Sequence, residues 1–504
     1  MREGGPRVGR SFLGAGAVLA LTLAAGRLSG LLREMQLAAS FGVTSNGDLA
    51  VILLTLPDLL VNVLLAGGLS AALVPRLRAL SPLEAASLFK STMIGVAAFF
   101  TAAAAAIVVW PGATFAILAP GMAAVDVDLH RRALGAVALA IPLTAITGVT
   151  TAYLNAHQRF FVAGCGTLIF NLCVIGALLV ADSSIAMALS LALGIALGAM
   201  LRAASQLVAL PHSAWERRAR PGRLDGPFVR AFMAATGAAS LMLLVPIVVR
   251  ALASLTGAGS IASFNYATKL VEVPVGILIS AAGTVALARL SEHHARGDAA
   301  GARVLTRDSL QRTILLSLAV LGPGLLFADA AVAALLGRGQ MSVEALHRVS
   351  VLTRLALLGL PFVAIVAIAG ASLNAQGRSV GMLRGTLWAA LALPLLALPG
   401  VLLHSERYLM LAVVAFQAVH SLILLRVARI PTLGPAGWLG PTMLGRVALI
   451  GALTAVVGVL DRILLVESHW IRLVVATATF AVAAALPLRL WRGSPPAVES
   501  PDDR

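Results

Sequence analysis

Fourteen long apolar segments follow one another along the chain, and this recurrence limits the possible folds more than any single motif. A helix crosses a bilayer with about 20 apolar residues, and a chain of 504 residues holds about 14 such helices with their loops. The segments lack the two-residue alternation of a membrane β-barrel. We therefore predict an all-α polytopic membrane protein with about 14 transmembrane helices. Their centres lie near residues 27, 60, 100, 144, 171, 195, 240, 275, 320, 361, 391, 418, 452 and 480.

The composition and the distribution of charge agree with this class. The chain is 59% hydrophobic and only 12% charged, unlike soluble globular proteins. A net charge of +16 would suggest a nucleic-acid partner in a soluble protein, but most basic residues here gather in alternate loops, as in cytoplasmic loops of membrane proteins. We therefore expect no nucleic-acid partner and predict that both termini are cytoplasmic. The basic residues of these loops include Arg76, Arg78, Lys90, His157, Arg159, Arg217, Arg218, Arg220, Arg223, Arg289, Arg296, Arg303 and Arg307.

An internal repeat relates the two halves of the chain. The sequence LNAHQR at 154–159 returns as LNAQGR at 373–378, and each copy follows an apolar segment with a central proline, Pro142 or Pro361. Both pairs are 219 positions apart. An even number of helices per repeat gives the two copies the same orientation, as in transporters that rock two lobes around a central site. The alternative is chance similarity between two segments rich in Leu and Ala.

The repeat predicts the domain organisation. Residues 1–225 form an N-terminal lobe of six helices, and residues 226–430 form a C-terminal lobe of six. Two further helices follow in residues 431–491. The last segment, RGSPPAVESPDDR at 492–504, has the composition of a disordered tail, which we place in the cytoplasm.

Two arginines, Arg27 and Arg33, interrupt the first apolar segment in the run GRLSGLLRE. Burying a guanidinium in hydrocarbon costs about 3 to more than 10 kcal/mol, so such residues usually face a wet cavity and bind charged cargo. On a helix the two arginines are about 9 Å apart along the axis and about 120° apart around it. They therefore cannot share one narrow face, but both can border one broad cavity. We predict a binding site for an anionic substrate. The alternative is that Arg33 extends to the membrane interface.

A second group of charges lies in SIASFNYATKLVEVPVG at 260–276, where Lys269 and Glu272 are three residues apart. An ammonium and a carboxylate one helical turn apart can pair, which lowers the cost of burying them. We predict that Lys269, Glu272 and, in the preceding segment, Arg250 contribute to the substrate site. A purely structural pair and an interfacial position for Arg250 are the alternatives.

Polar residues at the ends of apolar segments have two interpretations. Asp48 and Asp58, near the ends of the second segment, are expected to cap helices or to lie at the interface. The residues of the repeated motif are predicted to shape a cytoplasmic gate, with ordinary helix-end anchoring as the alternative. These gate candidates are Asn155, Arg159, Asn374 and Arg378.

Motifs for other chemistry are absent from the sequence. It contains no GxxxxGK[ST] nucleotide loop, no HExxH and no CxxC. Cys165 and Cys173 lie eight residues apart on one apolar segment, which is too far for a disulfide within one helix. We therefore predict no catalytic residue, no metal and no cofactor, and a transporter instead of an enzyme.

The assembled motifs resemble the MurJ/MviN family of bacterial lipid II flippases, within the multidrug, oligosaccharidyl-lipid and polysaccharide exporter superfamily. The resemblance runs from about residue 12 to residue 430 and on toward 490. It rests on several motifs together, since each alone is weak. They are GRLSGLLRE at 26–34, LPDLL at 56–60, GGLSAALVPRL at 67–77, LAPGM at 118–122, LNAHQRF at 154–160 with Asn171, and SIASFNYATKLVEVPVG.

The resemblance implies a substrate and a site. Arg27 and Arg33 match two first-helix arginines of the family's central cavity, and Lys269 matches an arginine of the eighth helix. Family members carry lipid-linked peptidoglycan precursor to the outer leaflet of the bacterial cytoplasmic (inner) membrane. Expected partners are therefore a polyprenyl-pyrophosphate-linked glycan (lipid II) and membrane lipids. The protein is expected to act as a monomer associated with cell wall synthesis proteins.

The chain departs from the family pattern at several positions. Val61 and Asn62 stand where the family has a basic pair, and Val249 replaces an acid. Lys269 in place of arginine lacks the bidentate fork of a guanidinium. These departures indicate a divergent member of the family.

The leading hypothesis is a lipid II flippase that works by alternating access and binds the pyrophosphate in a cationic cavity. The alternatives are a flippase for another polyprenyl-pyrophosphate-linked glycan, a drug or cation antiporter, and a non-transporting membrane scaffold in cell wall synthesis. Buried charges that are mainly basic argue against a cation antiporter. The lack of a sizeable cytoplasmic domain argues against a scaffold.

Overall fold

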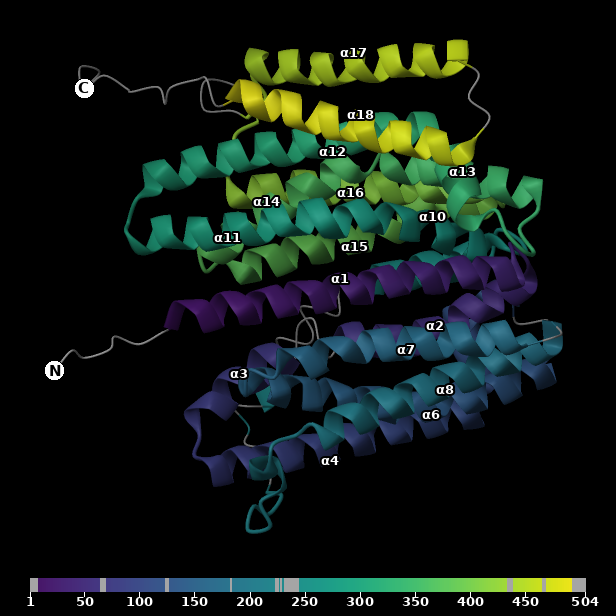
Figure 1. Cartoon of the computed structure of the whole chain (residues 1–504), viewed down its shortest axis with the longest axis vertical. Coiled ribbons are helices and arrows are strands. Elements are labelled where there is room, and N and C mark those ends of the chain that lie inside the picture. The colour runs from purple at the N-terminus through teal and green to yellow at the C-terminus, as the bar shows by residue number, and fades with distance from the viewer. Residues whose placement is uncertain are drawn as a thin grey trace. The chain divides into compact units, whose positions relative to one another are not determined.

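The computed structural model describes residues 8–63, 69–122, 127–181, 184–222, 226, 229–230, 244–432, 438–464 and 468–491. Throughout these residues the regular secondary structure is helical, with no strand (Figure 1). The chain divides into an N-terminal unit, residues 1–266 with 338–342, and a C-terminal unit, residues 267–337 with 343–504. The boundary falls within α10, whereas the lobe limits at 225 and 430 remain predictions.

In the N-terminal unit, α1 packs along α7, and α8 packs against both α6 and α7. Tyr153 of α6 and Phe89 of α4 are buried with ring centroids 4.5 Å apart. Helix α4 begins sharply because Ser81 and Glu84 form a capping box around Pro82. The elements are α1 (Val8–Phe41), α2 (Ser45–Val63), α3 (Leu69–Ala79), α4 (Pro82–Val109), α5 (Pro111–Leu118), η2 (Pro120–Met122), α6 (Val127–Ala156), α7 (Phe160–Val180), α8 (Ser184–Val208), η3 (His212–Trp215) and the unlabelled helix Leu244–Ser254.

In the C-terminal unit, the long helix α12 contacts α11, α14 and α18. Its backbone leaves the helical region at Phe327, four residues after Pro323. Helices α13 and α14 form one apolar pair bent by 41°. The elements are α10 (Ser260–Pro274), η4 (Val275–Ile279), α11 (Ser280–Ala295), α12 (Ala299–Leu336), α13 (Val343–Leu357), α14 (Leu360–Ala375), α15 (Ser379–Leu402), α16 (Glu406–Ala428), α17 (Pro441–Leu464) and α18 (His469–Trp491).

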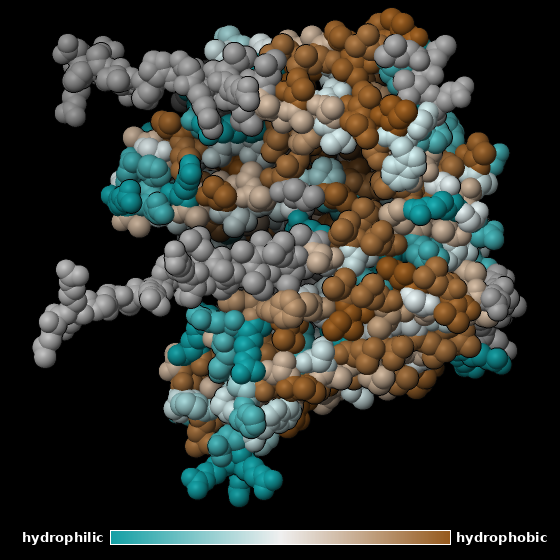
Figure 2. Space-filling view, viewed as in Figure 1, coloured by the Kyte–Doolittle hydropathy of each residue, from teal (hydrophilic) through white to brown (hydrophobic). Residues whose placement is uncertain are grey.

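Many of these helices are suited to a membrane. Among the described residues, eight helices are long and apolar enough to cross one (α4, α6, α7, α8, α12, α15, α16 and α17), and the bent pair α13–α14 adds a ninth. Large apolar side chains are exposed on their flanks, such as Val180 at 80% and Leu395 at 73%. Figure 2 shows hydrophobic residues along the helix flanks and hydrophilic residues near helix ends. The all-α polytopic class is confirmed, and the count of fourteen remains a prediction.

The repeated motif folds into the same turn in both units. Gln158, after α6, has φ +61°, and its counterpart Gly377, after α14, has φ +69°. The same three backbone hydrogen bonds close each turn. One of them joins the N–H of Arg159 or Arg378 to the carbonyl of the leucine five residues earlier, at 2.9 Å in both copies. Because a left-handed residue makes this helix ending possible, the repeat extends from sequence to backbone geometry.

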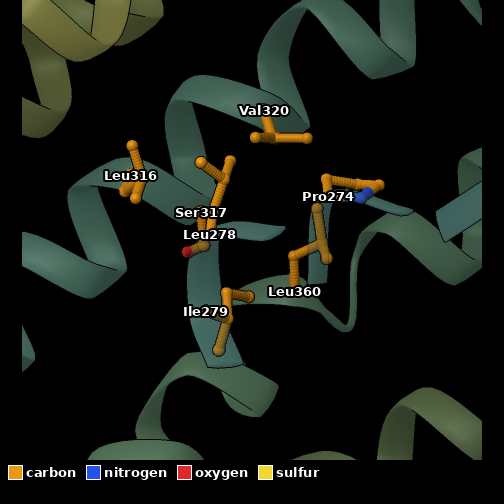
Figure 3. A pocket seen from close by; sticks show the side chains of 7 residues that line it. All are labelled: Pro274, Leu278, Ile279, Leu316, Ser317, Val320 and Leu360. Atoms are coloured by element: carbon orange, nitrogen blue, oxygen red, sulfur yellow. The ribbon is translucent and has the colours of Figure 1, made fainter. Parts of the chain in front are cut away.

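A π-helical turn, η4, joins α10 to α11. It begins directly after Pro274, which has no N–H to donate to the helix. Pro274, Leu278, Ile279, Leu316, Ser317, Val320 and Leu360 line a narrow crevice beside this turn (Figure 3). The crevice has no room for a water-sized molecule. Cys165 and Cys173 are free thiols, as the sequence predicts.

Candidate functional site

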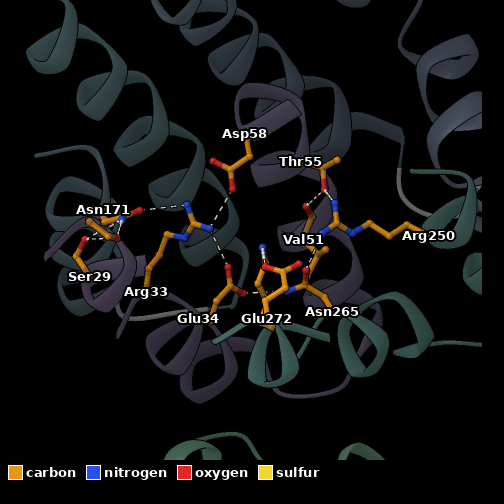
Figure 4. Close-up of polar contacts among 12 residues, drawn as sticks. Ser29, Arg33, Glu34, Val51, Thr55, Asp58, Asn171, Arg250, Asn265 and Glu272 are labelled. Atoms are coloured by element: carbon orange, nitrogen blue, oxygen red, sulfur yellow. Dashed lines mark hydrogen bonds and ion pairs between the residues drawn. The ribbon is translucent and has the colours of Figure 1, made fainter. Parts of the chain in front are cut away.

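Arg33 on α1 is the centre of a polar network inside the N-terminal unit (Figure 4). The residue is 6% exposed, and its Nη2 lies 2.8 Å from Glu34 Oε1 and 3.0 Å from Asp58 Oδ2. Its Nη1 donates to Asn171 Oδ1 on α7 at 3.2 Å. Two carboxylates therefore surround one guanidinium, and the positive charge of Arg33 is compensated within the protein.

The network continues to α10 through Asn265. Its Nδ2 donates to Glu34 Oε2 at 2.9 Å, and its Oδ1 accepts from Arg250 Nη2 at 3.0 Å. Arg250 Nη1 donates to Thr55 Oγ1 on α2 at 3.0 Å. An amide suits this position because it offers a donor to a carboxylate and an acceptor to a guanidinium. Side-chain hydrogen bonds thus join α1, α2, α7, α10 and the helix Leu244–Ser254.

Small residues on α1 allow Asn171 to approach Arg33. Asn171 Nδ2 donates to Ser29 Oγ at 2.9 Å and to the Gly26 carbonyl at 3.4 Å. A Cβ on Gly30 would lie 3.7 Å from the same nitrogen. Gly26, Ser29 and Gly30 therefore form a surface on α1 against which α7 packs closely. This packing fixes the amide that orients the Arg33 guanidinium.

The other predicted substrate residues have different surroundings. Arg27 is exposed, and within the described part of the chain it has no hydrogen bond or ion pair. Lys269 Nζ lies 2.8 Å from Glu272 Oε2, with side chains 28% and 58% exposed, so the predicted pair is present. The structure therefore brings Arg33 and Arg250 into one network and leaves Arg27 outside it.

The gate candidates contact helix ends. Arg159 Nη1 donates to the carbonyl of Ala209, just after α8, at 2.6 Å. The carbonyl of Asn155 accepts from Arg78 at 3.4 Å. In the second copy the contacts are local, since Arg378 donates to Gln376 Oε1 at 3.3 Å and Asn374 Oδ1 accepts from Ser379 Oγ at 3.2 Å. These contacts are those of helix-end anchoring, and the gate remains a prediction.

One pairing and one charged residue of the N-terminal unit were missed in the sequence. Asp58 pairs with Arg33 across 25 positions, which no local spacing indicates, and the capping or interfacial role expected of Asp58 stays a prediction. Arg202 on α8 is 4% exposed. A lone arginine within an apolar helix is itself a signal of function, and it identifies Arg202 without any structure.

The chemistry available to this network is ion pairing and hydrogen bonding. Among the described residues, no group of three or more His, Cys, Asp or Glu side chains is placed to hold a metal ion. Glu34 is 4% exposed, whereas the Asp58 side chain is 36% exposed. An anion that reaches Arg33 would therefore displace Asp58 more readily than Glu34.

The sequence matches the family model described as lipid II flippase MurJ over residues 37–392. The lipid II flippase MurJ of Burkholderia cenocepacia is 27% identical over 367 residues, which are 68% of this chain and 69% of that protein. The probable lipid II flippase MurJ of Thermotoga maritima is 25% identical over 271 residues, 53% of this chain and 54% of that protein.

Solved structures share the fold. A lipid II flippase MurJ in an inward closed conformation has a TM-score of 0.78 and 16% identity, with 94% of this chain and 100% of that chain covered. An inward-facing multidrug resistance MATE family transporter of the MOP superfamily has a TM-score of 0.65 and 14% identity, with 80% and 94% covered. At these identities the likeness concerns the architecture alone.

Proposed function

The chain belongs to the lipid II flippase MurJ family, and from this premise we propose that it moves lipid II from the inner to the outer leaflet by alternating access. The family match over residues 37–392 is the observation that carries the proposal. The protein acts as a transporter and catalyses no covalent step. In this proposal Arg27, Arg33 and Lys269 bind the pyrophosphate of the substrate, and Arg250 and Glu272 contribute to its binding.

The buried network supports this role for Arg33. A pyrophosphate needs clustered, well-oriented cationic donors, and Asn171 and Glu34 hold the Arg33 guanidinium in one orientation. The Lys269–Glu272 pair is partly exposed, so its ammonium is able to exchange a carboxylate for a phosphate oxygen. The turns at LNAHQR and LNAQGR shape the cytoplasmic gate.

Contacts among the basic loops support the proposed topology, an inner-membrane protein with cytoplasmic termini. In the N-terminal unit, Lys90 Nζ donates to the carbonyl of Glu216 at 2.7 Å, and Arg78 Nε donates to the carbonyl of Ala156 at 3.3 Å. Together with the bond from Arg159 to Ala209, these contacts gather basic loops at one end of this unit. The positive-inside rule assigns such an end to the cytoplasm. The protein works as a monomer near cell wall synthesis proteins.

Complementation tests the proposal. A bacterial host depleted of its own lipid II flippase should be rescued by this chain, and Arg33→Ala and Lys269→Ala versions, expressed at equal levels, should rescue poorly. Arg384→Gln on α15 removes a positive charge from an exposed position and serves as the matched control. Failure of a well-expressed, membrane-inserted parent would reject lipid II transport. It would then favour another polyprenyl-pyrophosphate-linked glycan, with Val61 and Asn62 as the first positions to change.

A further inference from the structure

Arg202 on α8 is a buried charge outside the Arg33 network. It is 4% exposed and its Nε is fully enclosed. Within the described part of the chain, that nitrogen has no hydrogen-bond partner. A buried guanidinium whose donors are incompletely matched is strongly unfavourable, so a position that keeps one points to a further partner that the described residues do not supply.

The neighbours of Arg202 hold it in place without satisfying it. A Cβ on Gly166 of α7 would lie 3.0 Å from Arg202 Cγ and Nε and 3.0 Å from Gln206 Nε2, so only glycine fits there without a shift. Gln206 Oε1 accepts from the hydroxyls of Thr150 at 2.5 Å and Thr151 at 3.1 Å. Even with its amide turned by 180°, Gln206 offers one acceptor, whereas a guanidinium carries five N–H donors.

Asp58 connects Arg202 to Arg33. Helix α2 packs against α8, and the Asp58 carboxylate interacts electrostatically with Arg202 while its Oδ2 lies 3.0 Å from Arg33 Nη2. On α7, the two arginines contact Gly166 and Asn171, which are about 7.5 Å apart along the helix axis. One partly exposed carboxylate therefore serves two guanidiniums that lie along the same helix.

We propose that Arg202 and Arg33 form a two-guanidinium site for a diphosphate, and that Asp58 takes the place of the anion when the site is empty. The identity of the anion, the pyrophosphate of lipid II, rests on the proposed function. A diphosphate has two phosphoryl groups, so each arginine has oxygens of its own to bind. Asp58 leaves Arg33 when the diphosphate arrives and returns when it departs. The exchange limits the time for which either guanidinium lacks a counter-charge.

The test is the binding of undecaprenyl pyrophosphate to the purified full-length protein in detergent, measured by native mass spectrometry. Arg202→Gln should weaken binding on the order of 10- to 100-fold, because charge-assisted hydrogen bonds are lost. Asp58→Asn should strengthen binding several-fold, because the competing carboxylate is removed. Arg384→Gln, the exposed control on α15, should bind as the parent does. The two substitutions should change the affinity in opposite directions, whereas general structural damage would weaken binding in both variants.

A second variant covers the case in which Arg202→Gln does not fold. Gly166→Ala keeps every charge but forces Arg202 or Gln206 to move by a few tenths of an ångström, and it should weaken binding to an intermediate degree. Folding of each variant is checked by its melting temperature. Unchanged binding in folded Arg202→Gln protein, or weaker binding in Asp58→Asn protein, would overturn the proposal.

Two further probes identify the source of the anion. Undecaprenyl monophosphate should bind more weakly than the pyrophosphate in the parent, and equally well in the parent and in Arg202→Gln protein. Competition by inorganic pyrophosphate that depends on Arg202 would show that the phosphate groups suffice without the lipid. If the parent fails to rescue flippase depletion yet binds the diphosphate through Arg202, the proposed function fails and this site stands. Rescue with binding independent of Arg202 would support the proposed function and reject this site.

Discussion

The two units hold their charged residues in opposite ways. In the N-terminal unit, Arg33 and Glu34 are buried and bond to partners 138 and 231 positions away, Asn171 and Asn265. In the C-terminal unit, Lys269 pairs with a residue three positions away on its own helix, and both side chains are partly exposed. The first arrangement depends on the packing of five helices, whereas the second needs only one helical turn.

This difference separates a preformed site from an adaptable one. A buried ion pair is destabilising by about 3–5 kcal/mol when one partner is removed, because the other charge stays uncompensated. An exposed pair contributes about 0–1 kcal/mol. We therefore expect the N-terminal site to be rigid and tightly coupled to folding, and the Lys269–Glu272 pair to open with little loss of stability. The following predictions test this comparison.

The largest effect is expected for Arg33→Ala. Removing the guanidinium leaves Glu34 and Asp58 together without their shared cation, so the free energy of unfolding should fall by about 3–5 kcal/mol. Unfolding of the purified protein in detergent measures the change. A loss below about 1 kcal/mol would mean that the N-terminal network is no more costly to break than an exposed pair.

Asn265→Leu should have the next largest effect. The change keeps the approximate volume but removes the donor to Glu34 and the acceptor for Arg250. Leaving buried polar groups without a partner should lower the free energy of unfolding by about 1–3 kcal/mol. Thr386→Val provides a control in the C-terminal unit, where one hydroxyl contacts His420. If Asn265→Leu lowers the free energy of unfolding no more than this control does, then the hydrogen bonds of Asn265 do not couple the two parts of the network energetically.

The repeated turns give the next prediction, with an expected effect of about 1–2 kcal/mol. Gly377→Gln places a side chain at a left-handed position and should destabilise the protein by about 1–2 kcal/mol. Gln158→Gly relieves the same strain in the other copy and should be neutral or stabilising. Thermal unfolding of both proteins measures the two changes. Equal destabilisation by both would contradict the equivalence of the two turns.

The smallest change in stability is expected for Lys269→Ala. The pair with Glu272 is partly exposed, so the free energy of unfolding should change by less than about 1 kcal/mol. Rescue of a flippase-depleted host should nevertheless fall, because the ammonium is proposed to bind substrate. Normal rescue would leave the C-terminal pair with a structural role only and would sharpen the contrast between the units.

The sequence was informative where structure is local. Spacing predicted the Lys269–Glu272 pair because both residues belong to one helical turn. Asp48 does cap a helix, but not the one in which it lies: its carboxylate accepts from the N–H groups of Gly259 at 2.7 Å and Ala262 at 2.8 Å, at the start of α10, and spacing along the chain does not indicate this partner. The all-α class of the fold followed from the length of the apolar segments alone. Within a bilayer the backbone must satisfy its own hydrogen bonds, and long apolar segments do so as helices.

The sequence failed where partners come from separate helices. Arg33 was recognisable as an unusual charge, but its compensation by Asp58 and Asn171 depends on how α2 and α7 pack against α1. Arg202 was recognisable in the same way, as a lone arginine within an apolar helix, but its neighbours were not. In both cases the rotation of each helix about its own axis decides which side chains meet. The residue pattern of one helix does not indicate how the neighbouring helices are rotated about their own axes.

The π-turn η4 has a consequence for how the C-terminal unit can present its charges. A π-turn holds one residue more than the α-helical ladder accommodates, and each residue rotates a helix by about 100°. Moving the extra residue along the helix exchanges hydrogen bonds and turns each residue that it passes by about that angle. Lys269 and Glu272 lie within two turns before η4, so a π-turn that moved past both of them would point both charges in a new direction. A straight α-helix has no such rotational adjustment and would have to tilt as a whole.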